Sequence, residues 1–219
     1  MSQHTVKEVR WHGPDVYELV VERDDFCFTV GDCIALYNRD ESVSRPYSIA
    51  SGTDENVLRF GIRRMPGGIV SPELADLTAG DQVRVDPPFG WFRPGANSDG
   101  DFIFIATGTG IGPFLAYLRS HPERPPSRCL YGVRHAHDAA DLAFLEASCP
   151  VTLAVSRESQ NGHHHGRVTD LLESLPLQPD SHIYLCGLDS MIDEVSDWCE
   201  DKGIDFPQIH REVFFNASS

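Results

Sequence analysis

The pattern of apolar residues changes once along this chain, at residues 93–100, a segment rich in proline, glycine and small polar residues. Before this segment, apolar and polar residues alternate in short stretches separated by turn residues, as is typical of antiparallel strands. After it, continuous apolar stretches alternate with helical patterns, as is typical of a parallel sheet covered by helices. The change predicts two domains, residues 1–97 and residues 98–219, and each is long enough to bury its own core.

The first domain is expected to be an antiparallel β-barrel. Its short strands, bounded by glycine, proline and aspartate, are expected over residues 6–11, 16–23, 33–38, 46–51, 57–63 and 82–86. One helix is expected before the last of these strands. Ser71 has the residue type of an N-cap, Pro72 suits the first helical position, and Gly80 would end the helix.

The second domain is expected to be an α/β domain with a parallel sheet. Its strands are expected over residues 102–106, 129–133, 151–155, 182–186 and 208–214. Helices are expected between them, over residues 113–120, 139–147, 167–174 and 189–202. The predicted fold class is therefore β-barrel plus α/β, with a six-stranded antiparallel barrel ahead of a parallel-sheet domain.

The charge of the chain narrows the choice of partners. There are 33 Asp and Glu residues against 18 Lys and Arg residues, which gives a formal net charge of −15. This balance argues against nucleic acid or a membrane surface as a partner, because both are bound by clustered Lys and Arg. Surplus carboxylates that only keep a protein soluble would give the same composition.

The six cysteines are scattered, with no CxxC pair and no run of four that would suit an iron–sulfur cluster. In a chain of this length they indicate reduced thiols. No apolar stretch approaches the ~18 residues of a membrane span, and the first residues lack an apolar signal core. We therefore expect a soluble, cytoplasmic protein.

A glycine turn follows the first apolar strand of the second domain. Its spacing is G-x-G-x-G, which differs from the G-x-G-x-x-G of the usual dehydrogenase fingerprint. Glycines at a strand–helix junction present backbone N–H groups to a diphosphate. The turn therefore predicts a dinucleotide site formed by Thr107, Gly108, Thr109, Gly110, Gly112 and Pro113.

A second motif, RPYSIAS at residues 45–51, places a cation, an aromatic ring and a hydroxyl in one alternating strand. Arg45 and Tyr47 share a face by strand alternation, and Ser48 faces the other side. A guanidinium suits a diphosphate oxygen, and an aromatic ring suits a flat ligand. Together the two motifs suggest that two dinucleotides bind side by side, one to each half of the chain.

Four motifs stand in an order that resembles the ferredoxin–NADP reductase family, in which a flavin-binding barrel precedes a pyridine-nucleotide domain. They are RPYSIAS, GGIVS at 67–71, ATGTGIGP at 106–113 and LCGLDSM at 185–191. The resemblance covers essentially the whole chain and is strongest to the bacterial branch. It implies that the protein is a flavoprotein with FAD and a nicotinamide nucleotide.

The resemblance implies a flavin site in the barrel. Tyr47 would supply the aromatic surface, Ser48 would reach the N5 region of the ring, and Arg45 would bind the diphosphate. The GGIVS motif implies a diphosphate at a helix start, which favours FAD over FMN. Further flavin contacts are expected from Pro46, Phe60, Ile62, Gly67, Gly68, Ile69 and Ser71.

The nicotinamide nucleotide is expected to be NADPH, with NADH as the alternative. Ser156, Arg157 and Arg167 follow the strand expected at 151–155, and guanidinium groups suit a 2′-phosphate. Glu158 is the residue type that an NAD-selective site would place on the ribose. The sequence therefore favours NADP and leaves NAD open.

The resemblance places the end of the strand at 182–186 beside the flavin edge, with Cys186 and Gly187 making room for the nicotinamide and Met191 completing the motif. Ser48 and Cys186 are the expected catalytic residues. Near the end of the chain, either Phe214 or Phe215 is a candidate to shield the flavin.

No metal site is expected. The run His163–His164–His165 invites a metal interpretation, but consecutive residues of a regular element cannot all face one ion. No cysteine or acidic motif completes a ligand set around it.

The expected function is hydride transfer between NADPH and FAD, with single electrons passed to or from a ferredoxin or flavodoxin. Such partners are usually acidic in this family. Docking would then need a basic patch, for which the barrel offers Arg39, Arg45, Arg59, Arg63, Arg64 and Arg93.

Two alternatives remain. One is the reductase component of an oxygenase or another electron-transfer system that uses NADH. The other is a flavin-carrying subunit of a larger complex, although such subunits in the family usually carry a cysteine cluster near the C-terminus, and this chain has no cysteine after Cys199.

Overall fold

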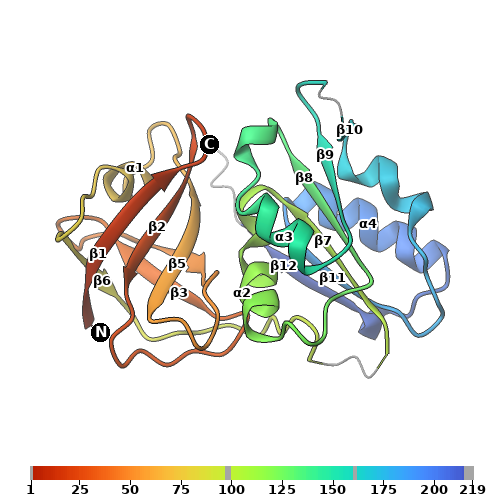
Figure 1. Ribbon diagram of the computed structural model, residues 1–219, viewed down its shortest axis with the longest axis horizontal. Coiled ribbons are helices and arrows are strands. Elements are labelled where there is room, and N and C mark those ends of the chain that lie inside the picture. The colour runs from red at the N-terminus through yellow and green to blue at the C-terminus, as the bar shows by residue number, and fades with distance from the viewer. Residues whose placement is uncertain (1, 97–99, 160–161, 215–219) are drawn as a thin grey trace. The chain divides into compact units, whose positions relative to one another are not determined.

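The computed structural model describes residues 2–96, 100–159 and 162–214. The chain forms two compact units (Figure 1): unit 1 contains Met1–Trp91 and Gly112–Ser120, and unit 2 contains Phe92–Ile111 and His121–Ser219. The predicted domain boundary between residues 97 and 98 lies outside the described residues and stays a prediction.

Unit 1 is built on the six-stranded antiparallel sheet that the alternating pattern predicts. The sheet order is β4-β3-β6-β1-β2-β5. The two outer strands are joined after β4, where Ala50 N donates to Arg59 O over 2.8 Å and Arg59 N donates to Ser51 Oγ over 2.7 Å. These bonds close the sheet into a barrel. The strands are β1 (Ser2–Trp11), β2 (Val16–Glu22), β3 (Cys33–Tyr37), β4 (Ser44–Ser48), β5 (Val57–Arg63) and β6 (Gln82–Val85).

Apolar residues from alternate positions of these strands fill the barrel. Leu19, Ile34, Leu58, Phe60 and Ile62 are all buried in one cluster. Removing such side chains from water is the main term that stabilises the barrel. Phe60 and Ile62 therefore point into the core, so any flavin contact that they make would come from their backbone.

The helix α1 (Val70–Ala75) differs from its prediction at both ends. It begins at Val70 after Ile69, so Ser71 is its second residue and not its N-cap. The Ser71 hydroxyl instead accepts a hydrogen bond from Met65 N at 3.0 Å and closes the loop before the helix. The helix ends at Ala75, well before Gly80. The Ser71 hydroxyl that was expected to cap the helix therefore closes the preceding loop instead.

The helix α2 (Gly112–Ser120) belongs to unit 1, although its sequence continues the glycine turn. Ser120 Oγ accepts from Thr53 N at 3.0 Å, and the Arg119 guanidinium donates to Ala50 O. Arg119 Nε also lies 3.5 Å from Glu55 Oε1. A Cβ at Gly52 would stand 2.9 Å from Arg119 Cβ, so the helix end and this loop meet without space between them.

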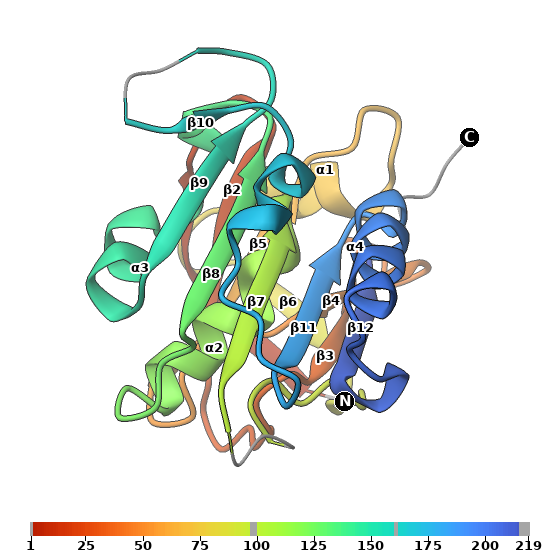
Figure 2. The same cartoon turned by 90° about the vertical axis from the view of Figure 1, so that its right-hand side faces the viewer.

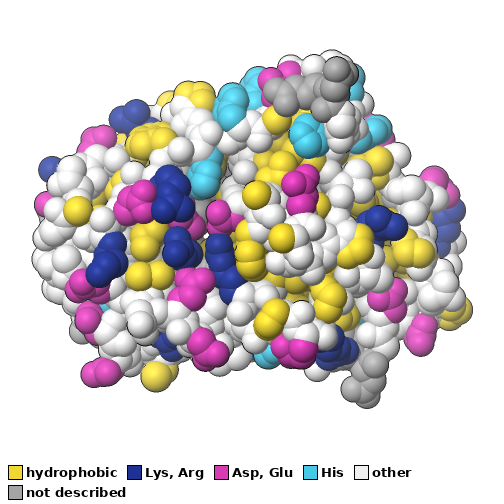
Figure 3. Space-filling view, viewed as in Figure 1, with side chains coloured by type: hydrophobic (Ala, Val, Ile, Leu, Met, Phe, Trp, Pro, Cys, Tyr) yellow, Lys and Arg dark blue, Asp and Glu magenta, His cyan; other side chains and the backbone are white. Residues whose placement is uncertain are grey.

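Alternating charges link this loop to the barrel strands. Arg59 pairs with Glu55 at 2.9 Å and with Glu18 at 3.1 Å, and Arg10 lies 3.4 Å from the same Glu18 carboxylate. Basic and acidic side chains are interspersed over the strands of unit 1 (Figure 3). Glu18 is 4% exposed, and two guanidinium groups offset the cost of burying its charge.

Unit 2 is built on a parallel sheet in the order β10-β9-β8-β7-β11-β12 (Figure 2). The predicted strands are confirmed, and the two-residue strand β10, which pairs with β9, was not predicted. The strands are β7 (Phe102–Thr107), β8 (Arg128–Val133), β9 (Val151–Val155), β10 (His164–His165), β11 (His182–Gly187) and β12 (Ile209–Val213).

Short helical segments connect these strands. The segment predicted as a helix over residues 167–174 is a 3₁₀ helix, η3 (Val168–Ser174). The others are η1 (Gly108–Ile111), η2 (Ala136–Asp138), α3 (Leu142–Ser148), α4 (Asp189–Asp201) and η4 (Phe206–Gln208). Among the described residues, no helix combines the length and the apolar character that crossing a bilayer requires. A cytoplasmic location stays a prediction.

Aromatic rings stack on one face of this sheet. Tyr184 of β11 lies parallel to His210 of β12, with 4.3 Å between the ring centroids. His210 Nε2 is 2.9 Å from Nδ1 of His182, so at least one of the two rings must be neutral to accept the hydrogen bond. Burial, and then the nearby His182, lower the pKa of His210.

We predict that acidification destabilises unit 2 through His210. The unfolded chain binds the proton near pH 6.5, before the folded protein does, so the stabilisation is present above about pH 6.5 and is lost as the pH falls below it. His210→Phe keeps a ring on Tyr184 and removes this proton. In urea denaturation, the variant should lose less stability than the wild type between about pH 8 and about pH 5.5. Equal losses in both proteins would contradict the prediction.

Candidate functional site

In unit 1, β4 presents a cation and a half-buried aromatic ring, as predicted. The Arg45 side chain is exposed and donates to Ser44 O at 2.8 Å, and no acidic group among the described residues forms an ion pair with it. Burial raises the pKa of Tyr47 to about 12. The Tyr47 hydroxyl has no hydrogen-bond partner in the part of the chain that the structure describes. Pro46, between them, is exposed.

Ser48 ends the same strand on the opposite face. It lies opposite Cys33 in the β3–β4 ladder, and its Oγ is 3.3 Å from Cys33 Sγ. The start of α2 covers it, because a Cβ at Gly112 would stand 3.8 Å from Ser48 Cβ. Ser48 is therefore buried although it faces outward from the barrel.

Tyr17 connects β4 to the loop of the predicted GGIVS motif. Its hydroxyl donates to Ser71 O over 2.6 Å, and its phenol lies close enough to Tyr47 for the two to interact electrostatically. Burial raises the pKa of Tyr17, so its hydroxyl keeps the proton that makes this bond. Sequence reasoning missed Tyr17, because nothing in its strand distinguishes it from a core tyrosine.

The loop itself is open to solvent. Gly67 has φ +74, and nothing lies within 4 Å of the position that a Cβ would take there, whereas a Cβ at Gly68 would stand 3.1 Å from Met65 O. Ile69 is 53% exposed. Gly67 and Ile69 can therefore present their backbone to a ligand, whereas Gly68 N already donates to Met65 O over 2.9 Å and the Ser71 hydroxyl is engaged by Met65 N.

In unit 2, the glycine turn lies directly against the end of β11. A Cβ at Gly110 would stand 2.5 Å from Cys186 O and 2.8 Å from Gly187 Cα. Thr107 Oγ1 accepts from Leu188 N at 2.9 Å. Gly187 has φ +138, and a Cβ there would overlap Thr107 Oγ1. The predicted nucleotide residues of two distant motifs are thus in backbone contact.

The rest of the turn is divided between the two units. Gly108, with φ +56, and Thr109 are half-buried in unit 2. Gly112 and Pro113 are buried in the first turn of α2, in unit 1.

Cys186 is buried at the end of β11, opposite Glu212 of β12. Its thiol donates to Glu212 Oε2 at 3.7 Å. Sequence reasoning missed Glu212, although an acid inside the last strand of a parallel sheet was a usable signal. Phe214 N donates to Gly187 O over 3.0 Å, which places Phe214 next to this pair. Phe215 lies outside the described residues.

The carboxyl ends of β8 and β9 bring the proposed phosphate residues together. Ser156 N donates to Val133 O and Arg157 N donates to Arg134 O, both over 3.0 Å. Ser156, Arg157 and Arg134 are exposed. Arg134 was missed by sequence reasoning, although it directly follows the predicted strand at 129–133.

Arg167 and Glu158 are engaged with other groups at this edge. Arg167 follows Gly166, whose N–H donates to Val155 O over 3.0 Å, but its guanidinium pairs with Glu194 of α4 at 3.3 Å. Glu158 Oε1 accepts from Ala136 N at 2.5 Å. The acid that would suit a ribose is therefore bound to the start of η2.

The remaining predicted residues are placed in other roles. Met191 is 2% exposed and packs in the core of unit 2, so a contact with nucleotide stays a prediction. His165 Nδ1 lies 2.9 Å from Glu158 O, and His164 Nε2 lies 3.5 Å from Asp170 Oδ2. Within residues 2–96, 100–159 and 162–214, no three His, Cys, Asp or Glu side chains are grouped to hold a metal ion.

Comparison with known proteins identifies both units. Residues 14–93 match the family described as Oxidoreductase FAD-binding domain, and residues 104–197 match Oxidoreductase NAD-binding domain. The chain is 32% identical over 200 residues to a flavodoxin/ferredoxin–NADP reductase of Shigella flexneri, and the match covers 81% of each chain. The chain belongs to the ferredoxin–NADP reductase family. It is therefore an oxidoreductase with domains for FAD and NAD(P).

Two further comparisons show that both an oxygenase component and a ferredoxin NADP+ reductase are similar to this chain. The chain is 29% identical to the toluate 1,2-dioxygenase electron transfer component of Pseudomonas putida, covering 87% of this chain and 60% of that longer protein. It superposes on a ferredoxin NADP+ reductase from Neisseria gonorrhoeae, solved with bound FAD and NADP, with a TM-score of 0.89 over 98% of each chain. The identity to that structure is 22%, so this likeness shows the shared reductase fold.

We predict that Gly110→Ala destabilises unit 2 by at least about 2 kcal/mol, because its Cβ meets backbone atoms that cannot move aside. The matched variant Gly108→Ala has open space and is strained only by its positive φ, which costs about 1–2 kcal/mol. Thermal denaturation of both variants measures the difference. If Gly110→Ala were as stable as the wild type, the close backbone contact would be wrong.

Proposed function

We propose that this enzyme transfers hydride between NADPH and FAD and exchanges single electrons with a ferredoxin or flavodoxin. The observation that carries the proposal is the contact of the glycine turn with Cys186 and Gly187. In this contact, the backbone proposed to bind the diphosphate and the residues proposed for nicotinamide lie at one edge of one sheet.

The residues of unit 1 fit an FAD. An exposed guanidinium at Arg45 suits the diphosphate, and the half-buried Tyr47 offers an aromatic surface with a hydroxyl that no described residue engages. The open backbone at Gly67 would approach the phosphates closely. Ser71 would take part through its backbone, since its hydroxyl closes the loop.

When bound, FAD supplies the exchange between a hydride and single electrons. The protein contributes alignment. Ser48 would donate a hydrogen bond toward the N5 edge of the ring, and Cys186 would present a small side chain beside the nicotinamide. Glu212 would fix the direction of the Cys186 thiol by accepting its S–H. We propose these as the catalytic and positioning roles.

NADPH is favoured over NADH by the edge formed by β8 and β9. Three exposed residues, Ser156, Arg157 and Arg134, are brought to this edge by neighbouring backbone hydrogen bonds, and guanidinium groups bind a doubly charged phosphate well. The carboxylate of Glu158 is held by η2, which weakens the case for ribose recognition by this acid. Arg167 is expected to contribute less, because Glu194 already pairs with it.

We predict that Arg157→Ala raises the KM for NADPH by about tenfold to a hundredfold, as expected for the loss of a charge-assisted hydrogen bond. The KM for NADH should change little, because NADH lacks the 2′-phosphate, so NADH serves as the internal control. Steady-state rates with both nucleotides measure the effect. An equal rise for both would place Arg157 outside the phosphate site.

The electron partner is proposed from the names of the relatives. The Shigella flexneri relative acts with flavodoxin or ferredoxin by its name, and the Pseudomonas putida relative belongs to an oxygenase system. The name of the Shigella flexneri relative includes NADP, which agrees with the NADP site proposed here. A ferredoxin or flavodoxin is therefore the preferred partner. Arg59 is neutralised by Glu18 and Glu55, and Arg64 lies 3.9 Å from Asp76, so the basic patch for an acidic partner would rely on the other arginines of the predicted set.

The test is stopped-flow mixing of FAD-loaded protein with NADPH or NADH, followed by ferredoxin, flavodoxin or an oxygenase ferredoxin as acceptor. We expect faster flavin reduction by NADPH. Electron transfer to ferredoxin or flavodoxin should slow severalfold between about 0.05 M and about 0.5 M salt, because screening weakens the attraction. Faster reduction by NADH and transfer only to the oxygenase ferredoxin would favour the alternative. A protein that binds no FAD would overturn both.

A further inference from the structure

One loop of unit 1, residues 64–71, is held at both ends by the turn end of the β1–β2 hairpin. At the start of the loop, Arg64 N donates to Asp15 O over 2.7 Å. At its other end, the hydroxyl of Tyr17 donates to Ser71 O over 2.6 Å. The loop carries the first glycine of the GGIVS motif, whose backbone is proposed to approach the FAD phosphates. The hairpin therefore sets where this part of the proposed site begins and ends.

Two hydrogen bonds within the loop fix the course of its backbone. Met65 N donates to Ser71 Oγ over 3.0 Å, and Gly68 N donates to Met65 O over 2.9 Å. Gly67 has open space around it, and Ile69 is 53% exposed. The backbone that is open to a ligand is therefore a short segment between fixed points.

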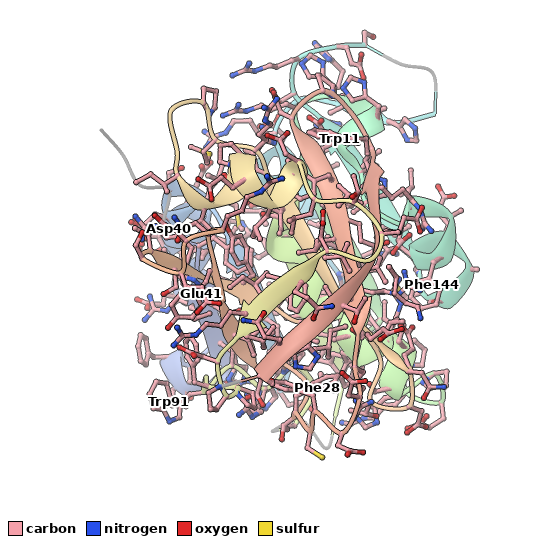
Figure 4. The ribbon with its side chains drawn as sticks, turned by 90° about the vertical axis from the view of Figure 1, so that its left-hand side faces the viewer. Trp11, Phe28, Asp40, Glu41, Trp91 and Phe144 are labelled. Carbon is pink, nitrogen blue, oxygen red and sulfur yellow. The ribbon has the colours of Figure 1, made fainter. Side chains whose placement is uncertain are left out.

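The ring of Tyr17 is fixed by the strands on either side of it. Tyr17 is fully buried and pairs across the hairpin with Trp11, with 5.2 Å between the ring centroids. Trp11 lies near the turn of the hairpin (Figure 4). On the other side of β2, Tyr17 lies opposite Ile62 of β5. A ring packed in this way holds its hydroxyl in one place.

The acceptor of this hydroxyl lies in the first turn of α1. A carbonyl oxygen has two lone pairs, so Ser71 O can accept the tyrosine hydroxyl together with a hydrogen bond of the helix. The tyrosine bond therefore adds one connection between the end of the loop and the barrel. The phenol of Tyr17 also lies close enough to Tyr47 to interact with it electrostatically, so Tyr17 lies near both parts of the proposed FAD site.

We propose that Tyr17 is a positioning residue for FAD, whose hydroxyl holds the loop 64–71 where the backbone of Gly67 and Ile69 is presented to the diphosphate. The inference rests on the proposed function. The loop is already ordered when FAD arrives, so less of the binding free energy is lost in ordering it.

Two tyrosine variants separate this role from a general loss of stability. Tyr17→Phe removes the hydroxyl and keeps the ring beside Trp11. Tyr131→Phe is the matched control, because Tyr131 is a fully buried tyrosine of unit 2 whose hydroxyl accepts from Ala140 N at 3.2 Å. Each variant loses one hydrogen bond between a buried phenol and the backbone, and only Tyr17→Phe changes the loop.

The first measurement is amide hydrogen exchange by NMR on the protein without FAD. The N–H groups of Met65 and Gly68 bond within the loop, so they exchange when the loop opens. Tyr17→Phe should speed their exchange about threefold to tenfold, the range expected for one neutral hydrogen bond. Tyr131→Phe should leave it within about twofold of the wild type. Unchanged exchange in Tyr17→Phe would overturn the inference.

The second measurement is the affinity for FAD, from fluorescence titration of the same proteins. Tyr17→Phe should weaken FAD binding about threefold to tenfold, and Tyr131→Phe should stay within about twofold of the wild type. In the FAD-loaded proteins, the phosphorus NMR signals of the diphosphate should shift in Tyr17→Phe and stay in place in Tyr131→Phe. Equal weakening in both variants would show a general effect of stability and would overturn the role.

The outcomes also separate this role from the proposed function. Absence of FAD binding in the wild type would overturn both. Normal FAD binding in the wild type, with the same affinity and the same phosphorus signals in Tyr17→Phe, would overturn only the role of Tyr17.

Discussion

The glycine turn after β7 lies directly on the backbone at the end of β11, and the nucleotide site proposed for unit 2 depends on this contact. A Cβ at Gly110 would stand 2.5 Å from Cys186 O, so two peptide segments meet with no side chain between them. The turn can then present its N–H groups at the sheet edge. The β11–β12 register sets Glu212 beside Cys186, so the thiol and the residues proposed for the diphosphate meet at the end of the same strand.

The chain leaves this turn through a helix that belongs to the compact unit of the barrel. Arg119 and Ser120 contact the segment 50–55. Within this segment, Glu55 pairs with both Arg119 and Arg59. At its other end the helix begins with Gly112, beside Ser48. The fixed position of this helix therefore decides how deeply Ser48 is buried, and with it how narrowly its hydroxyl is confined.

In the proposed chemistry, the side chains of the protein align the reactants. The hydrogen-bonded pairs in the structure are suited to this role. The Cys186 thiol meets a carboxylate, the Ser48 hydroxyl meets a thiol, and the phenol of Tyr17 donates to a backbone carbonyl. Each pair fixes the direction of one group. Membership of a reductase family with FAD-binding and NAD-binding domains agrees with such a site.

The sequence alone determined the strands other than β10, the barrel ahead of the parallel sheet and the family, because strand alternation, apolar runs and glycine turns are local patterns with fixed periods. It also singled out Arg45, Tyr47 and the glycine turn. Only the tertiary structure decided that Ser71 closes a loop, that α2 packs with the barrel, and that Glu212 and Cys33 lie beside Cys186 and Ser48. These relations depend on strand register and on which groups compete for one hydrogen bond, and both are set by residues far apart in the chain.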